Sequence, residues 1–300
     1  MRWKGRRESD NLEDRRGSGG AKAGGISIIG LVVAFVAWKF FGVDPQQAYQ
    51  VTKQVTQQQP ATNTPLSQPT AEQQEAKQFV STILADTEDT WSEIFKAHQM
   101  QYKAPKLVLY SGATATDCGT GQSAMGPFYC PSDQTVYLDT QFFMEMRQEL
   151  GIVGNKNKTE LSRNDQAGDF ALAYVISHEV GHHVQNLLGI SNQVQNQRRK
   201  LSQAQGNQLS VRLELQADCF AGMWAKSNDQ RTHFLDEGDI DEAMDAAQKI
   251  GDDYLQKRST GQIVPDSFTH GSSQQRMTWF KRGFESGSLD SCNTFSQGAV

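Results

Sequence analysis

The hydrophobic positions of this chain mostly follow the spacing of helices. Between residues 71 and 100 apolar side chains recur at helical intervals, as at Phe79, Ile83 and Trp91. The same spacing predicts four more major helices and one short one. They cover 140–150, 169–188, 196–227 with an interruption near Gly206, 239–257 and 272–287.

Short runs of β-branched and aromatic residues predict a small sheet. They lie at 106–110, 128–129 and 135–138, and a Pro-Ser-Asp turn separates the last two. Residues 151–168 are polar and predict a loop. The fold class is therefore α+β, mainly helical with a small sheet, in one domain over 71–300. An edge strand near 128–139 would suit the binding of an extended peptide by strand addition.

One apolar run, residues 23–43, precedes this domain. Its length suits a single membrane-spanning helix of about 20 residues. Residues 1–22 carry seven Lys or Arg, and the positive-inside rule predicts a basic cytoplasmic tail with the rest of the chain exported to the periplasm. A cleaved signal peptide is the alternative. The long basic region and the missing A-x-A site favour an uncleaved anchor in the inner membrane.

Composition adds three expectations. Residues 44–70 are rich in Gln, Thr and Pro, which predicts a disordered linker. The net charge of −5 argues against nucleic acid as a partner. Four cysteines all follow residue 71, and an even count outside the cytoplasm predicts two disulfides, Cys118–Cys130 and Cys219–Cys292. A cysteine zinc site is the alternative, but no C-x-x-C spacing supports it.

The most specific motif is His178-Glu179-Val180-Gly181-His182 in the 169–188 helix. Histidines four residues apart share one helical face and can grip one zinc ion, and Glu179 lies beside that metal as a candidate base. Catalytic zinc keeps three protein ligands and an open position. A third histidine six residues further on would indicate a metzincin, but Leu188 stands there.

Two acids on the 196–227 helix offer the missing ligand. Glu214 and Asp218 are four residues apart in an otherwise apolar stretch, so they share a face that is expected to be buried. One of them can bind the zinc while the other accepts a hydrogen bond from a ligating imidazole. The neighbouring His183 points about 100° away round the helix and is expected to be structural or to line the cleft.

The sequence H-E-V-G-H followed by E-L-Q-A-D resembles the gluzincin metallopeptidases, and more closely the bacterial neutral zinc metallopeptidase family. Further matching stretches are Gly126–Pro131, Val136–Asp139 and Glu214–Gly222. The resemblance covers nearly the whole chain and implies a zincin-like domain. It implies His178, His182 and Glu214 as zinc ligands, Glu179 as the base, and Asp218 as the partner of His178.

A further stretch, Thr269-His270-Gly271 to Arg276, is similar to the T-H-P-x-x-x-x-R sequence of membrane-associated gluzincins. This likeness implies that His270 faces the metal and stabilises the oxyanion. Gly271 replaces the proline of that sequence. Arg276 could orient His270 or brace a carboxylate. The alternative is a helix start at His270 with Arg276 as a surface charge.

These observations predict a membrane-anchored zinc endopeptidase that hydrolyses extracytoplasmic proteins or peptides with an activated water. Two other functions stay open. The domain could be a non-catalytic envelope binding module with a structural zinc, in which a fourth protein ligand closes the coordination sphere. It could also be a metal-dependent amidase that acts on cell-wall peptides.

Overall fold

The structure is a computed structural model that describes residues 1–16, 70–122, 126–140, 142, 168–296 and 298–300. Residues 1–15 and 71–300 form one compact unit. The predicted 140–150 helix and 151–168 loop lie almost entirely outside the described residues, as do the anchor at 23–43 and the linker at 44–70. No helix in the described ranges has the length and hydropathy needed to cross a membrane.

The described β-structure is a four-stranded sheet and a separate hairpin. The strand order in the sheet is β1-β2-β6-β5, where β1 and β6 run parallel to β2 and β5 runs antiparallel to β6. The strands of the sheet are β1 (Leu12–Asp14), β2 (Lys106–Tyr110), β5 (Phe128–Cys130) and β6 (Thr135–Asp139). β3 (Ala113–Thr116) and β4 (Gly119–Gln122) form the hairpin. The three predicted strands are confirmed, and β5 is an edge strand as expected.

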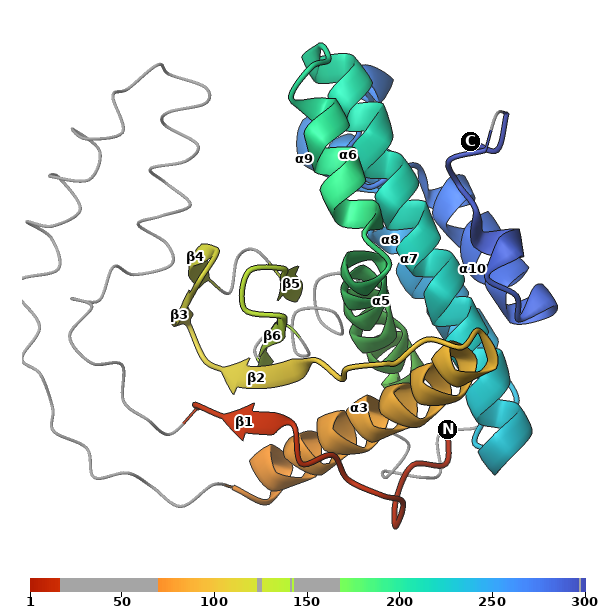
Figure 1. The fold of residues 1–300 in the computed structure, drawn as a ribbon. Coiled ribbons are helices and arrows are strands. Elements are labelled where there is room, and N and C mark those ends of the chain that lie inside the picture. Colours follow the sequence, from red (N-terminus) through yellow and green to blue (C-terminus); the bar gives the residue numbers. More distant parts are fainter. Residues whose placement is uncertain (17–69, 123–125, 141, 143–167, 297) are drawn as a thin grey trace, which may run out of the picture. The chain divides into compact units, whose positions relative to one another are not determined.

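Helices make up most of the described domain, which confirms the α+β class. Their bounds are α3 (Ala71–Ala97), α5 (Asp169–Leu187), α6 (Ile190–Arg198), α7 (Gln203–Thr232), α8 (Asp239–Lys249), α9 (Asp252–Thr260) and α10 (Ser273–Ser286). Figure 1 shows α5 between the sheet and the long helix α7, with α10 along the far side of α7. β5 and β6 contact α5 directly, so the sheet edge lies beside the helix that carries the H-E-x-x-H motif.

The helices predicted over 196–227 and 239–257 differ from the prediction in their ends and in their breaks. α6 begins at Ile190 instead of 196, and α7 ends at Thr232 instead of 227. The break expected near Gly206 lies at 199–202, because Ser202 and Gln205 form a capping box that starts α7 there. The helix predicted over 239–257 is divided into α8 and α9 at Gly251. A Cβ at Gly251 would lie 2.4 Å from the backbone nitrogen of Ser273, so the chain can pass α10 at this point only without a side chain.

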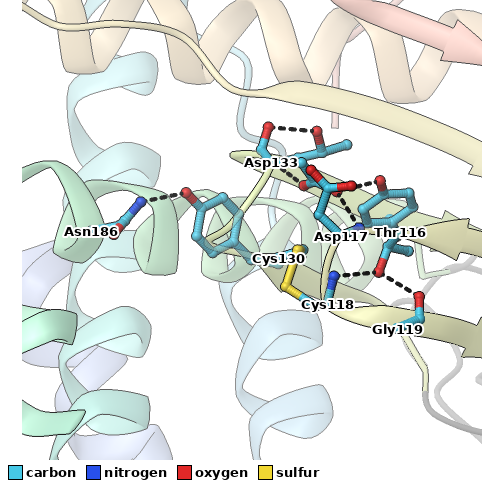
Figure 2. Close-up of a disulfide and its surroundings, with 10 residues drawn as sticks. Thr116, Asp117, Cys118, Gly119, Cys130, Asp133 and Asn186 are labelled. Carbon is cyan, nitrogen blue, oxygen red and sulfur yellow. Dashed lines mark hydrogen bonds between the residues drawn. A yellow bond between two sulfur atoms is a disulfide. The ribbon is translucent and has the colours of Figure 1, made fainter.

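Both predicted disulfides are present. Cys118 pairs with Cys130 and fastens the β3–β4 hairpin to the edge strand β5, as Figure 2 shows. Cys219 pairs with Cys292 and ties α7 to the C-terminal segment. All four cysteines of the chain are therefore oxidised, which fits the predicted non-cytoplasmic compartment.

The first fifteen residues differ from the predicted separate tail. They lie against the domain, where β1 adds a parallel strand to β2 and Trp3 packs edge-on against Phe79 at 5.4 Å. The physical reason is charge pairing, because basic residues of this segment meet acids on α3. The prediction from the sequence attributes the same charges to membrane topology.

Candidate metal centre

The two histidines of the motif lie on one face of α5. The rings of His178 and His182 are 4.8 Å apart between centroids and nearly perpendicular. Glu179 lies next to them, and its side chain is also largely buried. The helical repeat thus brings the three polar groups of the motif to the same cleft.

Glu214 of α7 completes a group of three donors. Its two carboxylate oxygens lie 3.2 Å from Nε2 of His178 and 3.4 Å from Nε2 of His182. The three donor atoms lie within 4.8 Å of one another, and the described residues contain no other such group of three. Two imidazole nitrogens and a carboxylate oxygen are one of the known donor sets of catalytic zinc, so these residues fit that ion.

The remaining ring nitrogens have partners that fix the two imidazoles. Nδ1 of His178 lies 2.8 Å from Asp218, and Nδ1 of His182 lies 2.9 Å from the side-chain oxygen of Gln185. Gln185 in turn donates to the carbonyl of Leu213 on α7. Both Nε2 atoms are therefore directed at Glu214. The sequence reading missed Gln185, although its position three residues after His182 on one helix was a usable signal.

Asp218 belongs to a buried network with Arg276 and Tyr174. The Arg276 guanidinium donates twice to the Asp218 carboxylate, at 2.9 Å each, and the Tyr174 hydroxyl donates at 2.5 Å. Burial alone would raise the pKa of Asp218, but Arg276 and His178 outweigh it and hold this pKa at about 2. The carboxylate is thus ionised when it meets His178. Of the two roles considered for Arg276, the structure shows that it braces a carboxylate.

The negative charges of Asp218 and Glu214 favour the binding of a cation at the two histidines. Burial lowers the pKa of His178, but the Asp218 and Glu214 carboxylates outweigh it and raise this pKa to about 10. Burial raises the pKa of Glu179 above its ordinary value, although both histidines act against this. A carboxyl group with a raised pKa is suited to exchange protons near neutral pH.

A close helix crossing makes this arrangement possible. A Cβ at Gly181 would lie 3.1 Å from both the Cα and the carbonyl oxygen of Ala217. The glycine inside the motif therefore lets α7 approach α5 closely enough for Glu214 to reach both histidines.

His270 lies on the loop between α9 and α10 and lines the same cleft, with half of its side chain exposed. Asp252, the first residue of α9, organises this loop. One carboxylate oxygen accepts the backbone N–H groups of Thr269, His270 and Gly271 at 2.8, 2.7 and 3.0 Å, and the other lies 3.2 Å from Nδ1 of His270. The hydrogen bond to Asp252 is the largest cause that raises the pKa of His270.

The same loop explains the departure from the T-H-P sequence. Gly271 has φ of +95° and donates its N–H to Asp252. Proline can do neither, because its ring fixes φ near −65° and removes the N–H. The sequence reading missed Asp252, since no spacing rule connects it to His270.

His183 is not one of the donors. It is fully buried, with Nδ1 2.9 Å from the hydroxyl of Tyr129 and Nε2 2.7 Å from the carbonyl of Lys103. Asn186 donates to the same hydroxyl, so the Tyr129 O–H donates to His183 and the His183 Nε2–H donates to Lys103. This histidine fastens the edge strand β5 to α5, which agrees with a structural role.

The cleft over the cluster has a volume of about 470 Å³. Its floor is formed by α5 and α7, and its wall by β5 and the segment before it, with Phe128 and Tyr129 at the surface. The cleft therefore combines polar groups at its base with apolar side chains along an edge strand.

Fold and site together define a candidate metal centre of the H-E-x-x-H type in an α+β domain. Residues 1–295 match the family described as "Putative neutral zinc metallopeptidase". The chain belongs to this family.

Two relatives show how far the similarity extends. The chain is 50% identical over 307 residues to "Uncharacterized protein YpfJ" of Escherichia coli (strain K12), covering 99% of each chain. It is 39% identical over 232 residues to "Uncharacterized protein Rv2575" of Mycobacterium tuberculosis (strain H37Rv), covering 74% of this chain and 73% of that protein. No solved structure gives a significant match.

Proposed function

We propose that this chain is a zinc-dependent endopeptidase that acts outside the cytoplasm. The observation that carries the proposal is the buried Glu179 beside the group of His178, His182 and Glu214 at the base of an open cleft. When bound there, zinc supplies a Lewis acid that activates water and polarises a carbonyl group.

Glu179 is the proton carrier. It takes a proton from the attacking water and passes the proton to the leaving amine, which a carboxyl group with a raised pKa can do. His270 faces the same cleft and, when protonated, donates a hydrogen bond to the negative charge that develops on the substrate oxygen. Asp218 and Gln185 keep the two ligating imidazoles oriented through Nδ1.

The edge strand supports an extended peptide as the substrate. β5 is three residues long, ends the sheet, and borders the cleft, so an extended peptide can add to it through backbone hydrogen bonds. Phe128 and Tyr129 offer apolar contacts to alternate side chains of such a peptide. The two disulfides support an oxidising compartment, and attachment to a membrane through residues 23–43 stays a prediction from the sequence.

Cleavage of an unfolded protein tests the proposal. The full chain, purified in detergent and loaded with zinc, is expected to cleave casein, and Glu179→Gln is expected to retain zinc but lose cleavage by at least about 100-fold. Glu285→Gln, an exposed glutamate on α10, is the matched control and should cleave like wild type. Cleavage that survives in Glu179→Gln would refute the mechanism. Tight zinc binding with no cleavage in wild type would favour a binding module.

A further inference from the structure

Four basic residues of the N-terminal segment 1–15 have acidic partners outside this segment, namely Arg2, Lys4, Arg6 and Arg7. Lys4 pairs with Glu75 at 2.6 Å, and Arg6 with Asp86 at 2.7 Å. Arg7 pairs with Glu88 at 3.1 Å and Asp89 at 2.7 Å, and Arg2 with Asp236 at 3.4 Å. These charges are compensated within the fold, so they no longer serve as an independent signal for membrane topology.

The Arg6–Asp86 pair has the least exposed side chains of these pairs, with Arg6 at 18% and Asp86 at 5%. Arg6 also donates to Asn228 of α7 at 3.2 Å, and Asn228 donates to the second carboxylate oxygen of Asp86 at 3.1 Å. Asp86 is 3% exposed and Asn228 is fully buried. A carboxylate at such a position needs a partner charge, and Arg6 supplies it from the N-terminal segment.

Residues on either side of Arg6 in the sequence, Trp3 and Ser9, also contact the domain. The Ser9 hydroxyl donates to Glu88 at 2.5 Å, and the Ser9 N–H donates to the Ser81 carbonyl at 3.1 Å. Trp3, 5% exposed, donates through Nε1 to Asp169, the first residue of α5. The segment thus touches α3, the start of α5 and the last part of α7, and the latter two helices carry the candidate metal ligands.

These contacts restrict the membrane topology of the chain, because both partners of each contact must lie on the same side of a membrane. A single membrane crossing between residues 16 and 70 would leave segment 1–15 and the domain on opposite sides, where none of these contacts can form. We propose that residues 1–15 are an integral part of the domain, that they lie on the same side of any membrane as the metal centre, and that they clamp α3, α5 and α7 together. This inference does not depend on the proposed peptidase activity.

Cysteine labelling in cells tests the shared compartment. Asp10 and Ser259 are both exposed, and all native cysteines are paired, so Asp10→Cys and Ser259→Cys each give the full chain one free thiol. A membrane-impermeant maleimide is applied to cells of a Gram-negative host with an intact inner membrane, and again after permeabilisation. Both variants are expected to behave alike, either both labelled before permeabilisation or both protected. Opposite behaviour of the two variants would overturn the proposal.

Thermal unfolding of the full chain tests the clamp. Arg6→Ala leaves the buried Asp86 without its charged partner and is expected to lower Tm by roughly 10 °C. Arg2→Ala is the matched control, because Arg2 is 63% exposed and its pair should contribute little. Arg6→Glu should unfold at a lower temperature still, and combining it with Asp86→Arg should recover part of the loss. A wild-type Tm in Arg6→Ala, or no recovery in the double variant, would contradict the clamp.

Discussion

A methyl group at Gly283 is expected to separate α10 from α7 and to disturb the metal centre from a distance. The two helices cross at Gly222 and Gly283, which lie against each other's backbone. A Cβ at Gly283 would lie 1.9 Å from the carbonyl oxygen of Cys219, and a Cβ at Gly222 would lie 2.1 Å from that of Phe280. These atoms belong to helix backbones, so no side-chain rotation can relieve the contact.

The size of the effect follows from these distances. Ordinary van der Waals contact begins at 3.4 Å, so Gly283→Ala moves the two backbones apart by at least about 1.5 Å. Arg276 on α10 donates to Asp218 on α7 at 2.9 Å, and such a shift takes this pair beyond hydrogen-bonding distance. Breaking a buried ion pair costs about 3–5 kcal/mol of unfolding free energy, which lowers Tm by roughly 10 °C in a domain of this size.

Two measurements on the full chain separate the effects of Gly283→Ala. Thermal unfolding reports the loss of stability, and zinc affinity reports the disturbance of the metal centre. Zinc affinity should fall by about 10–100-fold, because Asp218 no longer holds His178. Gly206→Ala is the matched control, because it adds a methyl group to another helical glycine, in the first turn of α7, where the nearest neighbouring atom would be in Arg198 at 3.7 Å. This control should raise the unfolding free energy by about 0.5–1 kcal/mol. Wild-type Tm and zinc affinity in Gly283→Ala would refute the reasoning.

Two further predictions concern the loop and the disulfides. Asp252→Asn removes the largest cause that raises the pKa of His270. In the proposed mechanism protonated His270 is the active form, and it is lost as pH rises through the pKa of His270. The alkaline limb of kcat/KM should therefore move to lower pH, and an unchanged limb would exclude this role for Asp252 and His270. Replacing Cys219 and Cys292 by alanine opens a loop of 73 residues and should lower the unfolding free energy by about 4 kcal/mol, which denaturant titration measures; a loss under 1 kcal/mol would count against it.

The candidate site was largely predictable because its geometry is local to two helices. Spacings of four residues place His178 with His182 and Glu214 with Asp218, and a buried pair of acids needs a partner. The structure brings these four residues together. The spacings do not predict that α5 and α7 cross closely. This crossing depends on Gly181, and only the packed structure shows it.

The features that were missed depend on contacts between distant parts of the chain. Asp252, at the start of α9, hydrogen-bonds to the loop that carries His270, and no periodicity in the sequence connects Asp252 with His270. Arg6 and its neighbours formed a basic run before an apolar stretch, a pattern that usually indicates membrane topology, whereas their partners lie about 80 residues further along on α3. The start of α7 is different, because the capping box of Ser202 and Gln205 is a sequence signal for a helix start and predicts it more accurately than Gly206 does.

A zinc titration of the metal-free full chain, followed by hydrolysis of an unstructured peptide, tests the central claim most directly. Activity is expected to rise in proportion to added zinc and to reach its plateau at one zinc per chain. His182→Ala should show no such rise, because it removes one of the three donors. Hydrolysis that is independent of zinc, or a His182→Ala variant with the wild-type titration, would contradict the assignment of His178, His182 and Glu214 as a catalytic metal centre.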